Sequence, residues 1–201
     1  MTKRFVSDID IDLGDRSILL PYLDTTPAAI RNETVRRHNS GVYVTDIPHD
    51  PINSIAAIDY NVAEDRGYVK LDLLNVWLYR HVRDEQHLVS LMREPDWSKL
   101  SDKSYVENLI HIGNHYETMT KMEPITSIPR LAMFLSLIRP GKKHLIGKSW
   151  KEIADTIWTI DEGGYSFKKS HGIAYAHLVV VHMNLLIEDS TALQHTLNKS
   201  D

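Results

Sequence analysis

The residues best suited to chemistry are three aspartates at alternate positions near the start of the chain, Asp8, Asp10 and Asp12. The apolar residues around them predict a β-strand over residues 3–13. Alternate side chains of a strand share one face, so the three carboxylates lie together and the isoleucines between them point into a core. Like charges this close repel each other, and a hard divalent cation such as Mg²⁺ turns the repulsion into attraction. The alternative is a solvated edge strand whose charges prevent pairing with other chains.

A fourth aspartate, Asp72, lies between two leucines in a second predicted strand, residues 68–74. An aspartate among apolar residues is costly to bury unless a partner neutralises it. Lys70 shares its face two residues earlier, so a local lysine–aspartate pair is one interpretation. The other is that this strand lies beside the first, where Asp72 joins Asp10 and Asp12 in a carboxylate set that holds two metal ions.

The composition limits the classes of protein and of site. The chain has 201 residues, 42% hydrophobic and 25% charged, which is ordinary for one globular domain or a domain with a lobe. It contains no cysteine, which leaves Asp, Glu, His and backbone oxygen as metal ligands. The longest apolar run, residues 176–187, is interrupted by polar residues, so no membrane-spanning segment is expected. The first residues show no signal-peptide pattern, and we expect a cytoplasmic protein.

The net charge of −4 does not by itself indicate a protein that binds nucleic acid. Basic residues nevertheless gather in three clusters, which suit an enzyme acting on phosphates when an acidic metal site lies beside them. Solvated side chains at helix ends explain any one cluster taken singly. The clusters are Arg31, Arg36, Arg37 and His38; Arg139, Lys142, Lys143, His144 and Lys148; and Lys168, Lys169 and His171.

The pattern of elements predicts an α+β protein: a small, mostly antiparallel sheet over about residues 3–75, followed by a helical lobe. The regions 1–75 and 76–201 are expected to pack as one unit. In the first region, Thr26 as a cap and Pro27 in the first turn predict a helix toward Arg37. The expected strands are residues 3–13, 41–47, 55–60 and 68–74, and residues 61–67 are expected to be a polar connection. The helices expected in the second region are residues 76–92, 104–122, 127–138, 149–158 and 170–187.

Histidines are weaker candidates for a site. His111 and His115 are four residues apart in a predicted helix, as in a zinc pair, but isoleucine stands where an H-E-x-x-H motif has glutamate. A surface or packed pair is the preferred interpretation. His177 and His182 lie in the apolar last helix and are expected to be core histidines with hydrogen-bond partners.

Five short segments follow the order of motifs in one known family. Residues 8–13, followed by Asp15-Arg16, are similar to a palm motif, P-D-I-D-x-D-F. Residues 37–42 are similar to K-H-A-G-G-V, and residues 64–74 to a second palm motif, G-x-V-K-F-D-F-L-G-L. Residues 132–141 are similar to A-L-x-R-P-G, and residues 164–175 to a fingers motif, G-Y-x-F-N-K-S-H-x-x-A-Y, which is the most specific of the five. Together they resemble the alpha subunit of bacterial DNA polymerase III, a C-family replicative DNA polymerase.

The resemblance implies a palm-like core in which Asp10, Asp12 and Asp72 hold Mg²⁺ or Mn²⁺ and are the catalytic residues of nucleotidyl transfer. Asp8 would support them. The residues that it places at nucleotide or DNA phosphates are Lys70, Arg37, His38, Arg139, Lys169 and His171. The implied partners are DNA, a nucleoside triphosphate, or another replication or phage protein, with no membrane involved.

The chain also departs from the family. It is several times shorter and has no counterpart of the amino-terminal phosphoesterase domain, the Gly-Ser nucleotide-binding segment, or the carboxy-terminal DNA- and clamp-binding modules. Lys168 replaces the asparagine of the fingers motif, and residues 76–126 match no motif. The compact size suggests a phage-encoded protein that acts in the cytoplasm of a bacterial host.

Three functions are open at this point. The first is a metal-dependent nucleotidyltransferase, favoured because aspartates are present at both palm motifs. The second is a non-catalytic DNA-binding or replisome-interaction protein on a palm scaffold, favoured by the missing nucleotide-binding segment and the negative charge. The third is a phage DNA-modifying enzyme that reuses the polymerase core for other chemistry.

Overall fold

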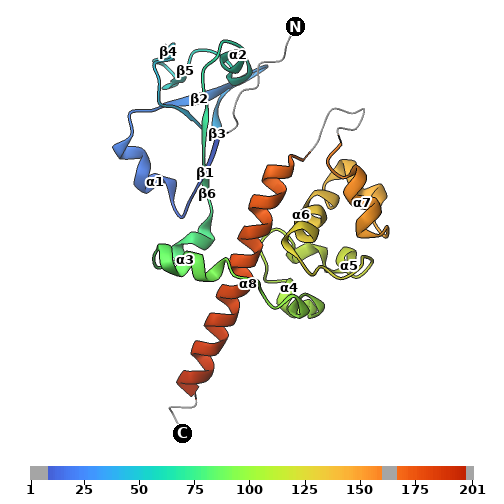
Figure 1. Cartoon of the computed structure of the whole chain (residues 1–201). Helices are drawn as coiled ribbons and strands as arrows, with labels where there is room; N and C mark the ends of the chain where they lie inside the picture. Colours follow the sequence, from blue (N-terminus) through green and yellow to red (C-terminus); the bar gives the residue numbers. More distant parts are fainter. Residues whose placement is uncertain (1–8, 160–166, 198–201) are drawn as a thin grey trace. The chain divides into compact units, whose positions relative to one another are not determined.

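The computed structural model describes residues 9–159 and 167–197, with side chains described up to Ser190. The chain divides into two compact units, Met1–Val82 and Arg83–Asp201, and each is described by itself (Figure 1). A small sheet combined with helices confirms the α+β class predicted from the sequence. The expectation that the two regions pack as one unit stays a prediction.

The first unit holds a four-stranded sheet in the order β1-β6-β3-β2. β1 (Ile9–Leu13) runs parallel to β6 (Leu71–Asn75). β3 (Val35–Tyr43) is antiparallel both to β6 and to β2 (Thr26–Arg31), so the sheet is mostly antiparallel, as expected. The other elements are α1 (Arg16–Leu19), η1 (Leu20–Tyr22), β4 (His49–Asp50), β5 (Ile55–Ala56), α2 (Tyr60–Asp65) and η2 (Trp77–His81).

The predicted helix from Thr26 toward Arg37 is wrong, because these residues form β2 and the start of β3. β2 lies at the sheet edge, where the missing N–H of Pro27 costs no ladder bond. The side chain of Asn32 accepts the backbone N–H of Thr34 at 3.2 Å and tightens the turn between the two strands. Pairing of β2 with β3 therefore overrides the local pattern of a helix cap. Residues 61–65, expected to belong to a polar connection, instead form most of α2 (Tyr60–Asp65).

The isoleucines of β1 do not enter a core, contrary to the prediction. Ile9 is 37% exposed and Ile11 is 36% exposed. The physical reason is that β1 is an edge strand with only one neighbour, β6. The buried cluster of the first unit lies elsewhere and comprises Ala28, Ala29, Tyr43, Ile47, Ile55, Ala56 and Ala63.

The second unit is helical. Its core packs α6 (Ile128–Leu137) against α8 (Lys169–Leu197), with Phe134 and Val179 fully buried. Ser127 caps α6, and Ser149 forms a capping box with Glu152 at the start of α7 (Trp150–Thr156), which confirms both predicted helix starts. The remaining helices are α3 (Glu85–Leu91), η3 (Trp97–Ser101), α4 (Lys103–Val106), η4 (Gly113–His115), α5 (Tyr116–Met119) and η5 (Pro140–Leu145).

Two long helices predicted here are broken into short ones. Residues 76–92 form η2 and α3, with Asp84 capping α3. Residues 104–122 are interrupted at His111, whose φ of 66° is left-handed, and the chain then closes on itself at Gly113, where a Cβ would lie 2.8 Å from the Glu107 carbonyl oxygen. His111 and His115 therefore do not share a helix, and the spacing of a zinc pair is lost.

α8 continues to Leu197, beyond the predicted end at residue 187. Its segment Lys169–Ser190 is long and apolar enough to cross a bilayer by length and composition, which the sequence analysis did not expect. Half of the tested window is buried inside the structure, and the core helix of a soluble protein passes the same test. This observation is therefore weak evidence for a membrane span.

Candidate metal and phosphate site

Asp10 and Asp72 are direct partners on neighbouring strands. The parallel register of β1 and β6 pairs Asp10 with Asp72 and Asp12 with Leu74. Paired residues of a sheet point to the same face, and so do residues two apart on one strand. Asp10, Asp12 and Asp72 therefore share one face, as the sequence analysis expected, while Asp8 lies outside the described residues.

The negative charges of Asp10 and Asp12 repel each other. Asp10 and Asp12 are exposed at the edge of the sheet, whereas Asp72 is 8% exposed. Partial loss of water around its carboxyl, and then repulsion from Asp10, raise the pKa of Asp12. The Tyr79 hydroxyl is close enough to respond, since burial and the charge of Asp12 both raise the pKa of Tyr79. A bound cation would relieve this repulsion.

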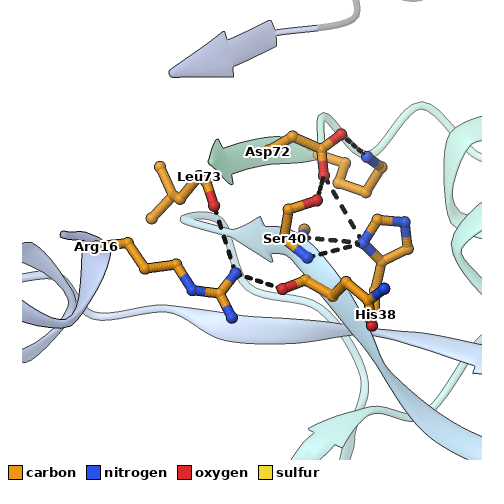
Figure 2. A network of polar contacts seen from close by, with 8 residues as sticks. Arg16, His38, Ser40, Asp72 and Leu73 are labelled. Carbon is orange, nitrogen blue, oxygen red and sulfur yellow. Dashed lines mark hydrogen bonds and ion pairs between the residues drawn. The ribbon is translucent and has the colours of Figure 1, made fainter. Parts of the chain in front are cut away.

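The Asp72 carboxylate is held by two side chains (Figure 2). The Ser40 hydroxyl donates a hydrogen bond of 2.7 Å to Oδ1, and the Lys70 ammonium forms an ion pair with Oδ2. The Lys70 and Asp72 side chains are only 17% and 11% exposed, so solvent screens their attraction less than at an open surface. Asp72 thus pairs with Lys70, as one interpretation of the sequence held, and it is the register partner of Asp10. That the three aspartates hold two metal ions stays a prediction.

A bulge in β3 brings Ser40 to Asp72. The β2–β3 register shifts between the pairs Pro27–Val42 and Ala29–Arg37, and residues 38–41 fall in this irregular stretch. The ring of His38 fastens the bulge, because its Nδ1 accepts the backbone N–H of Gly41 at 2.9 Å. A Cβ at position 41 would lie 2.7 Å from Cδ of Lys70, so a side chain there would force the lysine to shift.

His38 is a neutral donor in this arrangement. Its Nδ1 accepts from Gly41, which assigns the ring proton to Nε2. Burial and then the charge of Lys70 lower the pKa of His38, although Asp72 acts in the opposite direction. The contact of 3.7 Å between Nδ1 and Asp72 Oδ1 is therefore no ion pair.

Arg16 connects the bulge to β6 from the helix that follows β1 (Figure 2). Its guanidinium donates to the backbone carbonyls of Asn39 and Leu73, and its backbone N–H donates to the Asn75 side chain at 2.8 Å. Sequence reasoning assigned no role to Arg16 or Ser40. The Asp15-Arg16 pair belongs to the first palm-like segment, which was the available signal for Arg16, whereas Ser40 stands where the family motif has glycine and gave none.

The carboxylates suit Mg²⁺ or Mn²⁺ by their chemistry, since hard cations prefer oxygen ligands from several acidic side chains. Over the ranges that the structure describes, however, no three Asp, Glu or His side chains converge to hold one ion. In this structure the two oxygens of Asp72 are bound by the Ser40 hydroxyl and the Lys70 ammonium. Asp10 and Asp12 with a released Asp72 make a suitable donor set, and metal binding stays a prediction.

The remaining predicted phosphate ligands fall into two places. Arg37 is exposed on β3, next to His38. Arg139, Lys169 and His171 belong to the second unit, where Lys169 is exposed at the start of α8. There the Arg139 guanidinium lies 5.0 Å from the centre of the Phe167 ring. The centres of the Phe167 and His171 rings are 6.2 Å apart.

The other histidines of the second unit have separate surroundings. His182 is 5% exposed and its Nδ1 accepts the backbone N–H of Ile110 at 3.0 Å, which confirms it as a core histidine. His177 is partly exposed and bonds to the Ile173 carbonyl of its own helix, so it is not a core residue. Burial of the ring, and then the positive charge of Arg139, lower the pKa of His111.

Comparison of the chain with protein-family models, with curated proteins and with solved structures finds no match.

Proposed function

We propose that this chain is a metal-dependent nucleotidyltransferase related to the alpha subunit of DNA polymerase III, acting on DNA or nucleotides. The observation that supports it best is the pairing of Asp10 with Asp72 in adjacent parallel strands, with Asp12 on the same face. Two sequence segments far apart in the chain, each similar to a palm motif, thus contribute carboxylates to one surface. That juxtaposition is what nucleotidyl transfer requires of a protein.

The residues divide into carboxylates for metal and donors for phosphate. Asp10, Asp12 and Asp72 would hold Mg²⁺ or Mn²⁺, which when bound supplies charge stabilisation at the attacking and leaving oxygens. Lys70 and His38 lie beside Asp72, and the Lys70 ammonium and the Nε2–H of His38 are donors suited to phosphate oxygens. Arg37 on the same strand as His38 adds positive charge, and Arg139, Lys169 and His171 are proposed to bind phosphate in the second unit.

The test is extension of a primer on a DNA template, with Mg²⁺ or Mn²⁺ and nucleoside triphosphates. Asp10→Asn and Asp72→Asn should each reduce metal-dependent transfer to background while far-UV circular dichroism stays that of the wild type. Asp24→Asn, at an exposed position of the same unit, serves as a matched control and should retain activity. Wild-type activity in either Asp10→Asn or Asp72→Asn would refute the proposal.

A non-catalytic DNA-binding protein is a second candidate, favoured by the ion pair that already neutralises Asp72. DNA binding measured by fluorescence anisotropy separates the two. The second candidate requires binding that persists in Asp10→Asn and in the absence of divalent cations, together with no turnover in the wild type.

A further inference from the structure

The side chain of Lys70 passes over Gly41 before it reaches Asp72. Lys70 precedes β6 by one residue, and its side chain crosses Gly41, where any Cβ would meet Cδ of the lysine at 2.7 Å. The ammonium then reaches Oδ2 of Asp72, while Ser40 takes Oδ1. Figure 2 shows Ser40 joined to Asp72 by a dashed line.

The ion pair between Lys70 and Asp72 affects how well Asp72 can bind a metal ion. A carboxylate oxygen that neutralises an ammonium is a poorer ligand for a divalent cation, because the two cations compete for the same negative charge. Low exposure of both side chains strengthens the competition.

We propose that Lys70 is a positioning residue that acts as an internal counter-ion: it holds Asp72 until a divalent cation displaces it. The inference rests on the proposed function, since it takes Asp10, Asp12 and Asp72 as the ligands. Displacement leaves the ammonium beside the metal and available to a phosphate group. Binding of metal and binding of phosphate are then coupled through one side chain, each favouring the other.

The test is the affinity of the purified full chain for Mn²⁺ alone, measured by electron paramagnetic resonance of the free ion. Lys70→Met should bind Mn²⁺ about tenfold more tightly than the wild type, because the competing charge is gone. Lys70→Arg, which keeps a cation, should gain less. Arg66→Met removes an exposed positive charge from the same unit and controls for the change in net charge. In an Asp72→Asn background, Lys70→Met should bring no gain.

The outcomes separate this inference from the function beneath it. Wild-type Mn²⁺ binding that is lost in Asp10→Asn, but unchanged or weakened in Lys70→Met, overturns the counter-ion role and leaves the metal site standing. Absence of Mn²⁺ binding in both the wild type and Lys70→Met defeats the metal site itself. If Lys70→Met does not fold, the ¹⁵Nζ resonance of Lys70 in the wild type replaces it. That resonance should shift on addition of Mg²⁺, and an unchanged signal at saturating Mg²⁺ contradicts the proposal.

Discussion

The Ser40 hydroxyl donates a 2.7 Å hydrogen bond to Oδ1 of Asp72, across 32 residues of sequence. This hydrogen bond joins the bulge of β3 to β6, the strand that carries Asp72. Because Asp72 is almost buried, each of its oxygens needs a partner in the folded state. Ser40 supplies one of them, and Lys70 supplies the other.

Replacing Ser40 by alanine should therefore lower the free energy of unfolding by about 1–2 kcal/mol, as expected for a partly buried hydrogen bond to a charged group. Urea denaturation followed by far-UV circular dichroism measures the change. Ser40→Thr keeps the hydroxyl and should remain close to the wild type. A loss as large in Ser40→Thr as in Ser40→Ala would mean that the hydroxyl is not the stabilising group.

Asp50 should make the first unit sensitive to acid. Hydrogen bonds from Asn53 and from Arg31, whose Nη2 lies 2.6 Å from Oδ2, lower the pKa of Asp50 below its ordinary value of 3.8. A carboxyl with a lowered folded-state pKa contributes stability above its unfolded pKa and loses it as the pH falls. Asp50→Asn should therefore destabilise the protein at pH 7 and progressively less as the pH falls to about 2, where the carboxyl of the folded state begins to take up its proton.

Urea titrations of the wild type and Asp50→Asn at both pH values provide the measurement. Asp46→Asn, at an exposed position near the same hairpin, is the matched control. A stability gap that is equally wide at both pH values would contradict the assignment, because protonation of Asp50 removes its ionic interaction with Arg31.

Arg139 should contribute to the lowered pKa of two histidines in the second unit. Burial is the larger cause of the lowered pKa at both His111 and His115; the charge of Arg139 adds to it at both rings, whereas Lys143 adds to it only at His115. Arg139→Gln should raise the pKa of both rings, and Lys143→Gln should raise that of His115 alone. Titration of the histidine ring resonances by nuclear magnetic resonance distinguishes the two variants. An unmoved His111 in Arg139→Gln would show that the guanidinium does not lie near that ring in solution.

The mixed α+β class, the strands that bear the aspartates and the helix starts at Ser127 and Ser149 could all be predicted from the sequence, since each depends on neighbouring residues. Local patterns failed where partners from elsewhere in the chain compete with them. Residues 26–37 look like a capped helix, yet they pair as β2 and β3. Residues 104–122 have helical spacing, yet the chain turns at His111.

By itself, the sequence determined which residues share a face of a strand. Asp10 and Asp12 share a face of the first predicted strand, and Lys70 and Asp72 share a face of the second. Only the tertiary structure decided that Asp10 faces Asp72, that a bulge carries Ser40 to it, and that Arg16 connects that bulge to β6. The physical reason is the range of the interactions. Alternation along a strand follows from backbone geometry, whereas strand register and carbonyl contacts depend on segments that meet only once the chain has folded.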